Sequence, residues 1–72
     1  MNPPPLGSLV LYHFGKSKVF GIITSITLPG EEQQFYPIPS LFTLEIMETD
    51  GIKTWWDIHE LDLLNGKFQV IQ

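Results

Sequence analysis

A hairpin signal in the second half of the chain constrains the fold more than any other feature. In residues 41–48 every second side chain is large and apolar, and residues 52–57 return with the same alternation. Thr49-Asp50-Gly51 stands between them and is a strong tight-turn sequence. Because successive side chains of a strand point to opposite faces, the hairpin predicts one inner face made of Phe42, Leu44, Ile46, Ile52, Thr54 and Trp56.

Two adjacent tryptophans lie on the returning segment of this hairpin. If Trp56 faces inward, Trp55 must project outward beside Lys53 and Asp57. We predict that Trp56 is almost fully buried with Val10, Ile22, Leu61 and Val70. The outward Trp55 then becomes the first candidate for a binding residue, since tryptophan is enriched at the energetic centres of protein interfaces.

The rest of the chain divides into short β-like segments separated by turns. Apolar and β-branched residues predict strands over 8–14 and 19–28, joined by a turn at 15–18. Gly21 inside the second strand indicates a bulge or a close approach of two backbones. Residues 31–40 predict a long loop, residues 58–61 one helical turn over core residues Ile58, Leu61 and Leu64, and Asn65-Gly66 a second tight turn before a last strand at 68–71.

Five short strands and one helical turn before the last strand predict an all-β fold, a small and strongly bent barrel. The 72 residues are enough for one domain, in which roughly 60% of the unfolded surface can be buried. We divide the chain into a proline-rich N-terminal arm at residues 1–6, of extended polyproline type, and the barrel at residues 7–72.

Composition and charge exclude several functions. Four lysines without an arginine, against eight acidic residues, give a net charge of −4, which disfavours binding to nucleic acid. The apolar runs are too short to span a membrane, and the N-terminus lacks the pattern of a signal peptide. The absence of cysteine excludes disulfides. We expect no enzyme activity, no metal and no cofactor, because no catalytic motif is present.

Three segments resemble the SH3-like and Tudor-like small barrels, above all the short standalone proteins frequent in tailed bacteriophages. These segments are the "G-x-V/I-x-x-I" strand at residues 21–26, the "DG" hairpin at residues 50–57 and the closing segment at residues 60–64. The resemblance implies an SH3-like barrel and a role as a virion component or small accessory protein. Residues 11–14 and the double tryptophan also resemble eukaryotic SH3 domains, but the chain lacks their acidic residue and their "P-x-x-Y" segment, so binding of PxxP peptides is not carried over.

Two hypotheses follow for function. The first is a non-enzymatic structural protein that docks onto neighbouring subunits, homo-oligomers included, in a virion or in the host cytoplasm. Its predicted interface residues are Trp55, Phe35, Tyr36, Pro3, Pro4 and Pro5. The second is a Tudor-like reader that binds a cationic or proline-containing peptide in an aromatic cage, with Tyr12, Phe35, Tyr36 and Trp55 as candidate cage residues.

The acidic segment near the helical turn is a weaker candidate site. Asp57, His59, Glu60 and Asp62 are the one cluster of residue types that suit a metal or acid–base chemistry. We interpret it as the polar side of the turn.

The two tryptophans provide a stability test of this hairpin register. Trp56→Ala is expected to lower the free energy of unfolding by about 3–5 kcal/mol, since it removes a large buried ring. Trp55→Ala is expected to leave the isolated fold nearly intact. Urea unfolding followed by circular dichroism measures both, and a larger loss for Trp55→Ala than for Trp56→Ala would contradict the register.

Overall fold

The computed structural model describes residues 3–28 and 40–72. These residues form five strands and one short helix, β1 (Leu9–Phe14), β2 (Ser17–Thr27), β3 (Phe42–Glu48), β4 (Lys53–Ile58), α1 (Glu60–Leu64) and β5 (Phe68–Val70). The strands form one antiparallel sheet in the order β4-β3-β2-β1-β5. The predicted fold class, an all-β small barrel with a helical turn before the last strand, is confirmed.

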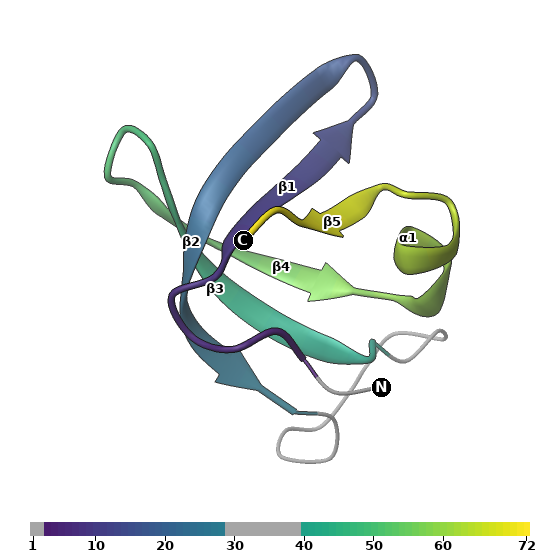
Figure 1. Cartoon of the computed structure of the whole chain (residues 1–72), viewed down its shortest axis with the longest axis horizontal. Coiled ribbons are helices and arrows are strands. Elements are labelled where there is room, and N and C mark those ends of the chain that lie inside the picture. The colour runs from purple at the N-terminus through teal and green to yellow at the C-terminus, as the bar shows by residue number, and fades with distance from the viewer. Residues whose placement is uncertain (1–2, 29–39) are drawn as a thin grey trace.

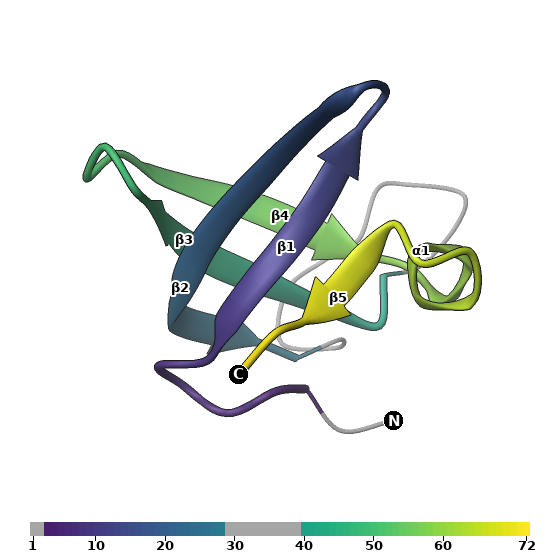
Figure 2. The ribbon, with the colours of Figure 1, turned by 45° about the horizontal axis from the view of Figure 1, so that its top comes forward.

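The long strand β2 gives the sheet its curvature. Its eleven residues pair with β1 along the first part and with β3 along most of the length. The register to β3 shifts between Ile23 and Ser25, and such an irregularity bends a strand and increases its twist. β1 and β5 therefore lie over β3 and β4, with the core between them (Figures 1 and 2).

The core consists of the inward side chains of all five strands. Trp56 is 6% exposed and Trp55 is 57% exposed, so the predicted burial of Trp56 and the predicted outward direction of Trp55 are confirmed. The predicted inward positions of β3 are also confirmed, because all three side chains are buried. The buried cluster is formed by Val10, Tyr12, Ile23, Phe42, Leu44, Ile46, Trp56, Ile58 and Phe68.

The predicted neighbours of Trp56 are corrected at three positions. Ile22 pairs with Leu9 on the outer face of the sheet, and its neighbour Ile23 enters the core instead. Leu61 is 65% exposed and Val70 is half exposed. Val10 alone of the four predicted neighbours belongs to the core cluster.

The end of β4 and the helix are also corrected. Ile58 ends β4, where it pairs with Phe42 and is fully buried, so the helical turn does not begin there. Ile52 precedes β4 and is exposed. In α1 the exposed leucines are Leu61 and Leu64, because the helix turns Asp62 inward and packs Leu63 against the core.

Gly21 marks a close approach between β2 and β3, one of the two outcomes that the sequence predicted. A Cβ atom at this position would overlap the Ile46 side chain and would lie 3.0 Å from the carbonyl oxygen of Met47. The register shift of β2 lies further along the strand. The glycine therefore allows Ile46 to occupy the centre of the core.

Replacing this glycine tests the close approach. Gly21→Ala is expected to lower the free energy of unfolding by about 1–3 kcal/mol, because the added methyl group overpacks the core. Ser25→Ala, on the same strand, is the matched control and should change stability by less than about 0.5 kcal/mol. Equal thermal stability of the wild type and Gly21→Ala would contradict the packing described here.

Candidate protein-binding surface

Trp55 projects from the outer face of β4. It pairs with Glu45 of β3, and the flanking outward residues of β4 are Lys53 and Asp57. The Lys53 ammonium lies 3.7 Å from a carboxylate oxygen of Glu45, and the Thr43 hydroxyl donates a hydrogen bond of 2.7 Å to Asp57. The indole is thus an exposed aromatic ring set among charged side chains that are themselves engaged with β3.

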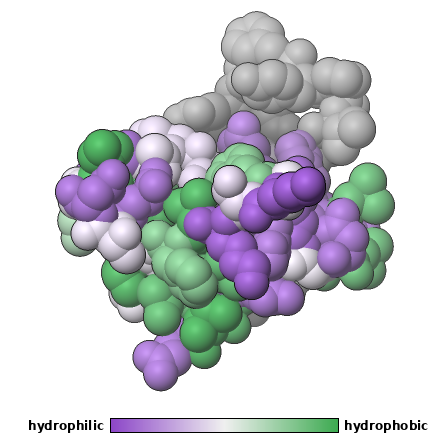
Figure 3. All heavy atoms as spheres, turned by 90° about the horizontal axis from the view of Figure 1, so that it is seen from above, coloured by the Kyte–Doolittle hydropathy of each residue, from purple (hydrophilic) through white to green (hydrophobic). Residues whose placement is uncertain are grey.

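An apolar surface lies next to Trp55 on the outer side of the sheet. Met47 lies diagonally across from Trp55 and pairs with Ile22, which in turn pairs with Leu9. In the next row Leu11 pairs with Phe20, and the Ile71 N–H donates to the Leu9 carbonyl oxygen. Figure 3 shows a broad apolar area on one side of the molecule, bordered by hydrophilic residues. We call the outward apolar side chains of these strands that reach the solvent the outer apolar face, made of Leu9, Phe20, Ile22, Met47 and Ile71, with Leu11 buried beneath them.

The proline segment is joined to the sheet by a small hydrogen-bonded turn. The Ser8 hydroxyl and N–H donate to the Pro5 carbonyl oxygen at 2.6 and 3.2 Å, and the Gly7 N–H donates to the Ile23 carbonyl oxygen. Pro3 and Pro4 are half-buried and Pro5 is exposed. Phe35 and Tyr36 lie outside the described residues.

Tyr12 cannot belong to the candidate aromatic cage together with Trp55. Tyr12 points into the core, where its ring centroid lies 5.2 Å from that of Trp56 and 6.4 Å from that of Phe68. Trp55 is on the opposite face of the sheet, so Tyr12 and Trp55 do not surround one point. The prediction that both belong to one cage is wrong, because the alternation of β1 directs Tyr12 to the same side as Val10.

The Tyr12 hydroxyl instead faces the helix. It lies near the buried carboxylate of Asp62, and that carboxylate accepts the His59 N–H at 2.9 Å. Burial of the phenol, with the negative charge of Asp62 as the next cause, raises the pKa of Tyr12 above its ordinary value. Asp62 therefore connects the start of α1 to β1 and acts as a structural residue.

The role of Asp62 escaped the sequence analysis, although a local signal for it was present. An acidic side chain three residues after the residue that begins a helix forms a capping box, and His59 and Asp62 have this spacing and form one. The other two members of the acidic cluster, Asp57 and Glu60, are exposed. Among the described residues no group of three or more metal-ligating side chains comes together.

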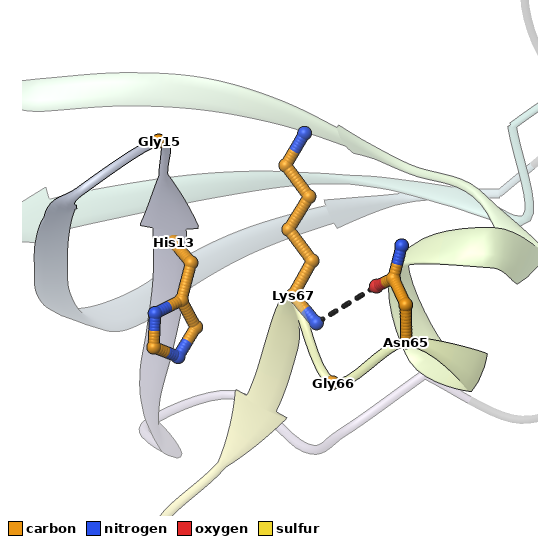
Figure 4. Close-up of a pocket in the computed structure, with 5 residues that line it drawn as sticks. All are labelled: His13, Gly15, Asn65, Gly66 and Lys67. Carbon is orange, nitrogen blue, oxygen red and sulfur yellow. Dashed lines mark hydrogen bonds between the residues drawn. The ribbon is translucent and has the colours of Figure 1, made fainter.

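A shallow depression lies between the end of β1 and the turn before β5. It has a volume of about 430 Å³ and is lined by His13, Gly15, Asn65, Gly66 and Lys67. The Lys67 N–H donates to the Asn65 side chain, and the Lys67 ammonium lies 5.5 Å from the Tyr12 ring centroid. The His13 ring and the Lys67 ammonium extend in different directions (Figure 4), so the two basic groups do not form one anion site.

Comparisons with protein-family models, with curated proteins and with solved structures find no match to this chain. The resemblance to phage barrels therefore stays a prediction from the sequence motifs. Within residues 3–28 and 40–72, no helix has the length and apolar character needed to cross a membrane.

The Tyr12–Asp62 contact predicts a pH dependence of stability. Because the folded state raises the pKa of Tyr12, it holds the phenol proton more tightly than the unfolded chain does. This contribution is complete below about pH 10 and is lost as the pH rises through the raised pKa. Wild type is therefore expected to lose stability relative to Tyr12→Phe above about pH 10.

Urea unfolding of both proteins between about pH 8 and about pH 11 measures this difference. Near neutral pH, Tyr12→Phe should be less stable than wild type by about 1–3 kcal/mol, because it removes the polar group that faces the buried carboxylate of Asp62. Parallel stability curves over the whole range would contradict the contact.

Proposed function

We propose that this chain is a non-enzymatic protein-interaction module that docks onto another protein through Trp55 and the outer apolar face. The observation that carries the proposal is the exposed indole of Trp55, held at the middle of β4 beside a continuous row of apolar side chains. An exposed apolar area of this kind on a small domain commonly marks an interface. Charged residues around it match the polar rim that such interfaces have.

The rigidity of the surface supports a docking role. Trp55 and Met47 are fixed on paired strands, so little conformational freedom is lost when a partner covers them. Burying the indole contributes about 2–4 kcal/mol to binding. The proline segment, joined to β2 through Gly7, supplies a second, polyproline-type element to the same role. The narrower role of virion component rests on the sequence resemblance.

A matched pair of variants tests the docking function. Trp55→Ala removes the proposed anchor, whereas Leu64→Ala removes an even more exposed apolar side chain from α1, outside the proposed surface. Quantitative cross-linking in the native cells should identify a partner that is cross-linked in equal amounts to the wild type and to Leu64→Ala. The amount of this partner cross-linked to Trp55→Ala should be at least about tenfold lower.

Folding of all three proteins is checked by circular dichroism and thermal unfolding. A partner that Trp55→Ala and Leu64→Ala retain equally would place the interface elsewhere and overturn the proposal.

A further inference from the structure

The backbone of β4 presents one open edge in the described part of the structure. β4 is at one end of the sheet, and its pairing with β3 is anchored by the Glu48 N–H, which donates to the Ile52 carbonyl oxygen. In an antiparallel ladder every second pair exchanges hydrogen bonds, so Thr54, Trp56 and Ile58 bond to β3 in the same way. The N–H and C=O groups of the alternate residues 53, 55 and 57 therefore point away from β3.

The side chains along this open edge form a self-complementary pattern. Lys53, Trp55 and Asp57 all project outward, and the charges of opposite sign are placed symmetrically about the tryptophan. When two such strands run antiparallel with Trp55 at the centre, Lys53 of each chain faces Asp57 of the other. A parallel arrangement in register would instead place lysine against lysine and aspartate against aspartate.

We propose that the partner at this edge is a second copy of the chain, bound through antiparallel pairing of β4 with β4 about a twofold axis at Trp55. This proposal names a partner for the Trp55 surface and rests on the proposed function of that surface. The two sheets then join into one. The outward backbone groups of residues 53, 55 and 57 form the ladder, and the two indoles meet across the axis as a directly opposed pair.

The charges at the edge favour this partner over an unrelated strand. A lysine on an open edge normally prevents edge-to-edge pairing, since it would be left without a partner. In the proposed dimer, Asp57 of the second copy lies opposite Lys53 and forms an ion pair with it. The Lys53–Glu45 ion pair within one chain has a long distance of 3.7 Å and an exposed lysine, so it contributes little and does not compete strongly with the contact between copies.

Charge reversal provides the decisive test. Sedimentation equilibrium of the wild type should show a monomer–dimer equilibrium. Lys53→Asp and Asp57→Lys should each weaken self-association at least about tenfold, because each variant creates two like-charge pairs. A mixture of these two variants should form a heterodimer, and the double variant Lys53→Asp/Asp57→Lys should recover self-association. Lys16→Asp, which makes the same charge change in the β1–β2 turn, should associate as the wild type does.

The absence of cysteine in the chain allows the register to be tested independently. Under mild oxidation Trp55→Cys should form a covalent dimer, because residues facing each other across the axis have Cα atoms about 5.5 Å apart. Lys53→Cys is the control on the same edge, since its two copies lie roughly 13 Å apart. Equal cross-linking rates would contradict a twofold axis at Trp55.

The outcomes separate this inference from the proposed function. A wild type that is monomeric at all concentrations, a discrete ring of more than two chains, or association that is insensitive to both charge reversals would overturn the homodimer. Each of these results leaves the docking of a different protein by Trp55 untouched, because that function is measured with Trp55→Ala and Leu64→Ala. Recovery of association in the mixture supports the homodimer whether or not a different partner is found.

Discussion

The contact between Tyr12, Trp56 and Phe68 holds the two ends of the sheet together. β4 and β5 are the end strands of the sheet, so side chains rather than a backbone ladder close the barrel between them. Trp56 of β4 reaches Tyr12 of β1 at 5.2 Å and Phe68 of β5 at 6.5 Å. Asp62 of α1 is buried in the same region and faces the Tyr12 hydroxyl. A domain of this size, without disulfides, depends strongly on such a cluster.

This closure determines the outer surface as well. Because Trp56 must face the aromatic cluster, its neighbour Trp55 must face away, and the same alternation directs Lys53 and Asp57 outward. The residues that stabilise the barrel and those that are available for binding thus alternate along one strand. Substitutions at odd positions of β4 can change binding with little effect on the core, whereas substitutions at the even positions disturb the fold itself.

The strands were predictable from sequence because their alternation is a local property, and a helical turn before the last strand was predictable too, but the side of that helix that faces inward was not. The hairpin at Asp50-Gly51 fixed the register that buries Trp56. Five residues of α1 are too few for a helical period to show which side faces inward, and the leucines suggested the wrong side. The burial of Asp62 depends on Tyr12, fifty positions away in the sequence. Within the candidate site, the outward direction of Trp55 was predictable, whereas the separation of Tyr12 from it required the arrangement of β1 against β4.

The open edge of β4 follows from the same construction. A sheet that closes through side chains leaves the backbone groups of its end strand without a ladder partner on one side, and an edge of this kind tends to pair with any other extended chain. Opposite charges on either side of Trp55 restrict that tendency, since they favour one direction and one register. β4 therefore combines an aromatic anchor, free hydrogen-bonding groups and a charge pattern that selects among partners. Because no other strand of residues 3–28 and 40–72 pairs with this edge, all three are available there for recognition.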